Sequence, residues 1–279
     1  MAAASDICAS CVKELPALPQ VVTDLIVAMD RDDLSIDEFA DKLARDQALA
    51  AKTLRLANSS FYGMPRQVEA IHDAVSVLGM RTVRSVVLAA SVTSAFRQDQ
   101  CPGFAFNDFW RHSMGTALCA KALARHADLN GEVAFTIGLI HDIGRLALIV
   151  CAGKQFAQVL KHRDDLDGPL LESERAVLGT DHCAIGRQIA EHWRFTPQIA
   201  DAVASHHEPP DSPEPTMAGL VHVADNIVHA LDLNHAPDEL VPPLSLHAWS
   251  ALRLTEPACR DIFDGVETQL QELCRTLLS

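Results

Sequence analysis

Histidine and aspartate side chains that could bind metal ions are spread through the middle of the chain. They are His112, His141, Asp142, His182, His206, His207 and Asp225. Imidazole and carboxylate ligands together suit divalent ions of intermediate hardness, such as Fe, Mn, Zn or Co. A carboxylate can bridge two such ions about 3.5–4 Å apart, and such pairs serve phosphate-ester hydrolysis by activating water and binding the phosphate. The residue types therefore indicate a metal centre suited to phosphate chemistry.

The adjacent pair His141 and Asp142 lies in the apolar stretch GLIHDIGRLALIV at 138–150. A charge there costs free energy unless it is paired or coordinated. On one continuous helix, the two side chains point about 100° apart and reach metal ions only at the helix edge. Taken singly, each candidate has a structural explanation, because a lone helical histidine is more often hydrogen-bonded than a ligand, and Asp225 could form a cap or an ion pair. The ordered set favours a site.

The other histidines are interpreted as structural residues. They are His72, His126, His162, His192, His222, His229, His235 and His247.

Charge is concentrated in the same segment of the chain. The 279 residues hold 37 acidic and 23 basic side chains, a formal net charge of −14. Residues 101–240 account for 19 of the acids and 10 of the bases, and for 11 of the 13 histidines. This balance argues against binding of a nucleic-acid polymer, which requires a basic face. It leaves room for a small anionic ligand, because bound divalent ions would make the site locally positive.

The sequence predicts a cytoplasmic protein without a membrane span. No apolar run reaches the roughly 18–20 residues that a span requires, and the N-terminus lacks the pattern of a secretory signal. Single cysteines in or beside apolar stretches are typical of reduced thiols; these are Cys101, Cys119, Cys151, Cys183 and Cys259. Cys8 and Cys11 form one C-x-x-C pair without a second, which fits an ordinary N-terminus better than a zinc or redox site.

Helical periodicity runs through nearly the whole chain and predicts an all-α fold. Ser35 and Glu38 form a capping-box pattern at the start of the helix that ends near Arg45. We predict further helices over 48–58, 68–78, 81–97, 107–126, 132–151, 153–163, 170–178, 182–193, 196–207 and 217–231, and an amphipathic helix at the C-terminus. The class is an N-terminal helical bundle packed on a second helical domain.

Breaks in the pattern divide the chain into three parts. The segment DQCPG at 99–103 separates an N-terminal helical region, 1–100, from a metal-site domain, 101–240. Residues 241–279 form a C-terminal extension, which could pack on the first region or serve a dimer. Four prolines make Glu208–Pro215 a loop directly after the paired histidines.

Several motifs together resemble the HDOD family, the HD-related output domains within the HD superfamily of metal-dependent phosphohydrolases. The resemblance covers roughly residues 12–235. Its first part consists of LPALPQVV at 15–22, RDQALAAKTLRLANSSFYG at 45–63 and AIHDAVSVLGMRTVRSVVL at 70–88. Its second part consists of FWRHSMGTALCAKALA at 109–124, GLIHDIGRLAL at 138–148, LGTDHCAIG at 178–186, ASHHEPP at 204–210 and LVHVADNI at 220–227.

The resemblance implies roles for individual residues. All seven candidates fall on metal-ligand positions of related HD-type phosphodiesterases, with Asp142 as the bridging carboxylate of a dinuclear centre. Arg145 stands where a lysine often contacts substrate phosphate, so Asp142 and Arg145 are the candidate catalytic residues. Fe or Mn is the expected metal, with Zn, Co and Ni as alternatives.

The chain departs from the cyclic-dinucleotide hydrolases of the HD-GYP type. Their Gly-Tyr-Pro loop is replaced here by the acidic, proline-rich segment 209–215, and Tyr62, the only tyrosine, is far away in the sequence. This difference argues against cyclic-di-GMP hydrolysis and leaves metal binding untouched.

Three functions are compatible with this pattern. The first is a bacterial signal-transduction module with a metal centre, whose output passes through contacts with a signalling protein. The second is an active phosphohydrolase that uses metal-activated water on a small phosphate ester. The third is a scaffold without metal.

Overall fold

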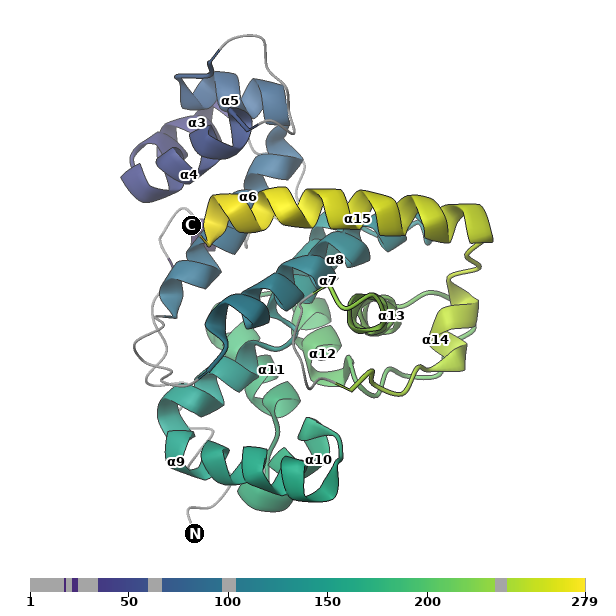
Figure 1. Ribbon diagram of the computed structural model, residues 1–279. Helices are drawn as coiled ribbons and strands as arrows, with labels where there is room; N and C mark the ends of the chain where they lie inside the picture. Colours follow the sequence, from purple (N-terminus) through teal and green to yellow (C-terminus); the bar gives the residue numbers. More distant parts are fainter. Residues whose placement is uncertain are drawn as a thin grey trace.

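The structure, a computed structural model, consists of helices joined by turns and loops in the residues that it describes (Figure 1). These residues are 18, 22–24, 35–59, 67–96, 104–233 and 240–278. The predicted all-α class is confirmed. Cys8, Cys11, Tyr62 and the predicted break at 99–103 lie outside the described residues.

In the N-terminal part, residues 35–59 and 67–96 of the described chain form four helices: α3 (Ile36–Ala44), α4 (Gln47–Ala57), α5 (Ile71–Leu78) and α6 (Met80–Ala95). Ser35 precedes α3, but its side chain makes no capping hydrogen bond, so the predicted capping box does not form. Gly79 lies in the left-handed region, with φ of 78°, and the chain bends there by 114° between α5 and α6. Glycine adopts this conformation without steric cost. The bend directs α6 away from α5 toward the central helices (Figure 1).

A helical hairpin forms the centre of the molecule. It joins α7 (Phe106–His126) to α8 (Gly131–Ile140), and Asn130 caps α8 by accepting hydrogen bonds from the backbone N–H groups of Glu132 and Val133. The two helices approach closely at Gly138, where a Cβ atom would lie 2.7 Å from Cα of Ala117. Only glycine permits this contact, and it fixes the end of α8 beside the middle of α7.

The chain leaves helical geometry at Asp142, two residues after the end of α8. We predicted a continuous helix over 132–151, and this prediction is wrong: α9 (Ile143–Leu166) begins after a turn that contains His141 and Asp142. Asp142 has φ of −98° and ψ of 8°, and its carboxylate makes no capping bond to α9 because it faces other side chains. The predicted helix at 153–163 is the continuation of α9 beyond a kink at Ala152.

Four shorter helices follow, close to their predicted ranges. They are α10 (Leu170–Leu178), α11 (His182–His192), α12 (Pro197–Ser205) and α13 (Met217–Ala230). Asp181 caps α11 by accepting a hydrogen bond from the N–H of Ala184, and Thr216 caps α13 in the same way through Gly219. These caps set where α11 and α13 begin.

The C-terminal extension folds back on the rest of the chain. It contains α14 (Leu246–Ala251) and α15 (Glu256–Leu277), which crosses the molecule in yellow in Figure 1. The apolar stripe of α15 is buried along α7, and the helix also contacts α4 and α6. Because α15 touches both the N-terminal helices and the central hairpin, it joins the two. The division at 100 and 240 stays a prediction.

One helical segment in the described residues, Gly131–Leu166, is long and apolar enough to cross a membrane. Its most apolar window has a mean hydropathy of 1.8 and is 83% buried inside the protein, as the core helix of a soluble protein would be.

The cysteine prediction is confirmed for Cys119, Cys183 and Cys259, which are free. It is wrong for Cys151, which is disulfide-bonded.

Candidate metal centre

The structure brings the seven candidate ligands together from five parts of the chain. One residue comes from α7, two from the turn between α8 and α9, one from the start of α11, two from the end of α12 and one from α13: His112, His141, Asp142, His182, His206, His207 and Asp225. All are buried except His207, which is half-buried. Each helix end or turn that carries a candidate therefore meets the others in the interior.

Asp142 lies at the centre of this cluster, and its two oxygens face different partners. Oδ1 lies 3.2 Å from Nε2 of His182 and 3.7 Å from Nε2 of His206. Oδ2 lies 3.8 Å from Nε2 of His141 and accepts a hydrogen bond of 2.7 Å from Nη1 of Arg145. A carboxylate that presents one oxygen to each of two ligand groups has the arrangement of a bridging ligand.

The close approach of α9 to α11 holds Asp142 beside His182. A Cβ atom on Gly144 would overlap the backbone carbonyl of His182 and lie 2.9 Å from the backbone nitrogen of Gly186. The missing side chain of Gly144 thus lets the start of α9 touch the start of α11.

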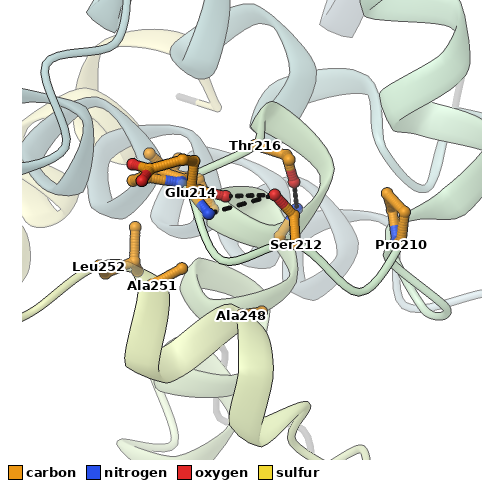
Figure 2. Close-up of a pocket in the computed structure, with 10 residues that line it drawn as sticks. Pro210, Ser212, Glu214, Thr216, Ala248, Ala251 and Leu252 are labelled. Carbon is orange, nitrogen blue, oxygen red and sulfur yellow. Dashed lines mark hydrogen bonds between the residues drawn. The ribbon is translucent and has the colours of Figure 1, made fainter.

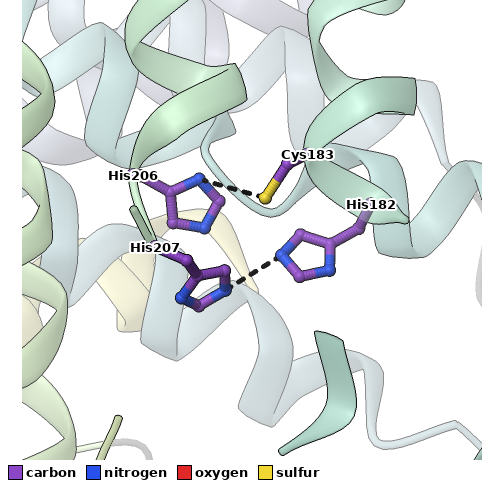
Figure 3. A group of neighbouring side chains, drawn as sticks. All are labelled: His182, Cys183, His206 and His207. Carbon is purple, nitrogen blue, oxygen red and sulfur yellow. Dashed lines mark hydrogen bonds between the residues drawn. The ribbon is translucent and has the colours of Figure 1, made fainter. Parts of the chain in front are cut away.

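The first ligand group, which we call the His182 group, contains His182, His206 and His207 (Figure 3). Nδ1 of His182 donates to Oε2 of Glu174 at 2.6 Å, and Nδ1 of His206 donates to the carbonyl of Val203 at 2.8 Å. A carboxylate and a carbonyl can only accept, so both neutral rings carry their proton on Nδ1. The lone pairs on Nε2 are then directed toward Asp142, as metal binding requires.

Cys183 lies beside the His182 group but on a different side of it. Its Sγ is 3.8 Å from Nδ1 of His206 (Figure 3), the nitrogen that bonds Val203. Nε2 of His206 faces Asp142 instead. We therefore place Cys183 behind His206, outside the set of atoms directed at Asp142.

The second ligand group, the His112 group, contains His112, His141, Asp225 and a residue that the sequence analysis left out, His229. Oδ1 of Asp225 lies 3.0 Å from Nε2 of His112, 3.6 Å from Nε2 of His141 and 3.4 Å from Nε2 of His229. Nδ1 of His141 donates to the carbonyl of Gly138 at 2.7 Å, so its Nε2 lone pair also faces the cluster. Three imidazoles thus surround one carboxylate oxygen.

Sequence reasoning missed two residues of this site, and only one carried a signal. His229 follows Asp225 by four positions, which places both on one face of α13. Glu174 is fully buried and accepts hydrogen bonds from both the backbone nitrogen and Nδ1 of His182. Nothing in the segment LLESERAVL distinguishes Glu174 from its neighbours, because its role depends on how α10 packs beside α11.

His222, interpreted as structural, has a structural role in the fold. Its Nε2 accepts a hydrogen bond of 2.9 Å from the backbone nitrogen of Ser245, so its Nδ1 donates to the carbonyl of His206 at 2.8 Å. His222 thereby connects the end of α12 to the segment before α14.

Distances within the cluster fit shared metal ions. Two nitrogen ligands about 2.1 Å from one ion, at angles between 90° and 109°, lie about 3.0–3.4 Å apart. The Nε2 atoms of His112 and His141 are 3.2 Å apart, and those of His182 and His207 are 3.1 Å apart. Nε2 of His206 and Oδ1 of Asp225 are buried and have no hydrogen-bond partner. Such orphaned atoms are costly unless a ligand satisfies them, and the donor set suits a transition ion.

The two groups differ in how they hold protons when no cation is present. Burial lowers the pKa of His206, but Cys183 and Asp142 outweigh it and raise the value to about 10. The pKa of His182 is also raised, because Cys183, Glu174 and Asp142 outweigh burial. Burial lowers the pKa of His112 more than Asp225 raises it.

The pKa values of His207, Asp142 and Asp225 depend on these charges and on burial. Burial and the positive His206 and His182 lower the pKa of His207 to about 2. Burial alone would raise the pKa of Asp142, but Arg145, His141 and His182 hold it well below its usual range. Asp225 is likewise held low, against burial, by the imidazoles around it. Both carboxylates are therefore ionised at neutral pH and available as ligands.

A cavity of about 1050 Å³ opens onto the centre. Its lining includes Asp142, His182 and His207 of one side of the cluster and Asp225 and His229 of the other. Three arginines also line it: Arg145, Arg163 and Arg175. Each arginine contacts a carboxylate, namely Asp142, Asp164 and the pair Asp181 and Glu208. The cavity is large enough for a nucleotide-sized ligand, and the arginines distribute positive charge along it.

The acidic loop after the paired histidines packs away from this cavity. Ser212 donates a hydrogen bond to the carbonyl of Glu214, and Thr216 continues into its cap on α13 (Figure 2). Between the loop, α13 and α14 lies a second cavity of about 10 Å³, which is room for one water molecule and no larger ligand. The loop is therefore a packing element, and only Glu208 at its start reaches the large cavity.

Comparison with solved structures shows the same fold in several proteins. An HDOD domain protein with unknown function from Geobacter sulfurreducens is 26% identical, with a TM-score of 0.78 over 95% of this chain and 92% of that one. A protein described as a "Putative phosphohydrolase" from Shewanella amazonensis SB2B is 27% identical, with a TM-score of 0.73 over 97% and 98%. A "Putative signal transduction protein" from Marinobacter aquaeolei VT8, 22% identical, shares the fold with a TM-score of 0.79, over 99% of this chain and 66% of that one.

The curated relatives are longer than this chain. An uncharacterized protein from Treponema pallidum is 20% identical over 265 residues, which are 92% of this chain and 51% of that protein. Ribonuclease Y from Opitutus terrae is 28% identical over 161 residues, 57% of this chain and 24% of that protein. The chain thus spans about half or less of these relatives. The HDOD domain model matches residues 15–209, most of the length, and the chain belongs to the HDOD domain family.

Proposed function

We propose that this chain is a regulatory HDOD module built around a dinuclear divalent metal centre that binds a small phosphate-containing ligand. The observation that carries the proposal is the position of Asp142, whose Oδ1 faces the His182 group and whose Oδ2 faces His141 of the His112 group. One ion would be held by the His182 group and Asp142, the other by the His112 group and Asp142. Fe or Mn is the expected metal, with Zn, Co and Ni as alternatives.

A scaffold without metal fits the buried charges less well. Asp142 and Asp225 are 4% and 1% exposed and both ionised, which is unfavourable unless cations compensate them. In the metal-free protein Arg145, His182 and His206 compensate Asp142, whereas Asp225 has only imidazoles around it. The unpartnered Oδ1 of Asp225 and Nε2 of His206 add to that cost. Bound cations would remove all of these penalties together.

The ligand reaches the centre through the large cavity. Bound divalent ions would supply positive charge that attracts a phosphate and polarises it. Arg145 has its guanidinium at the mouth of the site, 2.7 Å from Asp142, and is positioned to contact phosphate oxygens beside the ions. The net charge of −14 and the carboxylates along the cavity disfavour a nucleic-acid polymer.

In the regulatory function, ligand binding changes the contacts of the protein with a cytoplasmic signalling partner. Membership in the HDOD family supports this function, because the family resemblance implies a regulatory or docking role for this chain. The altered loop also supports it, since residues 210–216 pack against α13 and α14 and offer nothing to a substrate.

A second candidate function is metal-dependent phosphohydrolysis at the same centre. It is favoured by the cavity, which gives a small ester direct access to Asp142, Arg145 and His207. The names of two relatives, the phosphohydrolase-like protein of Shewanella amazonensis and ribonuclease Y, agree with such chemistry. In this function Asp142 would hold both ions and Arg145 would orient the phosphate.

Turnover separates the two functions. Metal-loaded protein would be assayed against a panel of phosphomonoesters, phosphodiesters and nucleotides, with Asp142→Ala as the control that removes the bridging carboxylate. The regulatory function predicts binding of a phosphate compound without turnover, measured by calorimetry. Hydrolysis that Asp142→Ala abolishes would establish the enzyme and overturn the purely regulatory function.

A further inference from the structure

We propose that His229 supplies an additional imidazole ligand to the metal ion of the His112 group. The inference rests on the proposed metal centre and adds to it a residue that the sequence analysis interpreted as structural. It makes the two metal positions unequal, with His112, His141, Asp142, Asp225 and His229 at one and Asp142, His182, His206 and His207 at the other.

The position of His229 on α13 places it beside Asp225. Asp225 and His229 lie one turn apart on α13, so their side chains emerge on the same face of the helix. Nε2 of His229 is 3.4 Å from Oδ1 of Asp225, a separation typical of two ligands of one ion. The ring of His229 also lies against that of His112, with centroids 4.6 Å apart. The donor atoms of His112, Asp225 and His229 all lie within 4.8 Å of one another.

The surroundings of Oδ1 of Asp225 also support a ligand role for His229. This buried atom has Nε2 of three imidazoles within 3.0–3.6 Å but no hydrogen-bond partner. Three imidazole nitrogens that converge on a buried carboxylate oxygen without a hydrogen-bond partner indicate a position for a cation among them.

The position of His229 at the wall of the large cavity also supports this role. Its side chain is 10% exposed and lines the large cavity, whereas those of His112 and His141 are 3% and 1% exposed. His229 thus closes the cavity side of the His112 group. A ligand there would leave fewer open coordination positions on this ion than on the ion of the His182 group.

The test compares metal binding in the wild type and in His229→Ala and His229→Gln, with His192→Ala, an exposed histidine of α11, as the control. Metal-free proteins are titrated with Co²⁺, and the visible d–d spectrum, the binding isotherm and the retained ions after dialysis are recorded. We expect both His229 variants to bind one of two ions at least about tenfold more weakly. The X-ray absorption spectrum of loaded protein should show about one fewer imidazole per two ions.

Circular dichroism and thermal melting of the metal-free proteins establish that each variant is folded, and His229→Gln keeps the size and polarity of the side chain if alanine disturbs packing. Both ions bound by folded variants with unchanged affinity and Co²⁺ spectrum would overturn the role of His229 and leave the metal centre intact. A wild type that binds no Co²⁺ would overturn the proposed function itself, and this inference with it.

Discussion

The two ligand groups share Asp142 but are built in different ways. The His182 group comes from the start of α11 and the end of α12, and hydrogen bonds to Glu174 and to the carbonyl of Val203 orient its rings. The His112 group comes from α7, from α13 and from the turn after α8, and it contributes its own carboxylate, Asp225. Nδ1 of His112 has no hydrogen-bond partner. Hydrogen bonds to neighbouring residues thus orient the rings of His182 and His206, whereas the orientation of His112 depends on the packing of α7.

This difference changes what each group carries when no cation is present. The raised pKa values of His182 and His206 mean that protons occupy the His182 group at neutral pH. His112 has a lowered pKa and is neutral there, beside the ionised Asp225. His112 therefore has no proton to release when a cation binds, whereas His182 and His206 must first release protons.

The largest effect is expected from Asp142→Ala, because Asp142 is the only residue that both groups share. The variant should retain less than one ion per chain after dialysis, measured by elemental analysis, where the wild type retains two. Asp261→Ala, an exposed aspartate on α15, is the matched control and should retain both ions. Full retention of two ions by folded Asp142→Ala would show that Asp142 does not bridge.

A smaller effect, a loss of affinity for one of the two ions, is expected from Glu174→Gln. Glutamine can still accept a hydrogen bond from Nδ1 of His182 but no longer carries the charge that increases the basicity of the ring. Loss of such a supporting carboxylate weakens metal affinity about 10–100-fold. Only the ion of the His182 group should be affected, as measured by titration.

Glu172→Gln serves as the control for Glu174→Gln, because Glu172 is exposed on the same helix. Equal weakening of both ions in Glu174→Gln would contradict the separation of the two groups.

A further expected effect, which needs no substitution, is a difference in pH dependence between the two ions. Neutral imidazole is the ligand, so protons compete with the metal wherever the metal-free group is protonated. With His206 near pKa 10 and His182 raised, affinity at the His182 group should increase as pH rises from 6 to 9, by up to about tenfold per unit for each proton released. His112 is already neutral, so the other ion should show a shallower slope.

Calorimetry in buffers of different ionisation enthalpy counts the protons released by each ion. Identical proton release for both ions would show that the groups do not differ in this way.

The helices were largely predictable because their signals are local. The ranges of α10, α11 and α13 follow from apolar periodicity with caps and glycines at their ends, and Gly79 marks the bend before α6. The continuous helix over 132–151 was wrong because the break at His141 and Asp142 has no turn residue of its own. It depends on the packing of Gly144 against α11, a contact between distant segments that periodicity does not register.

The site was predictable as a set of residue types and from the family resemblance, but not as an arrangement. His229 carried a weak signal, its four-residue spacing from Asp225. Glu174 carried none, since a glutamate that supports a histidine from another helix is defined only by tertiary packing. The division of the ligands into two groups likewise follows from which oxygen of Asp142 each one faces.

The metal content of the purified protein tests the account most directly. Protein produced in metal-replete medium and dialysed without chelator should contain two transition ions per chain by elemental analysis, with Fe or Mn prominent. A content well under one ion per folded chain would contradict the metal centre and every role assigned to the residues around Asp142.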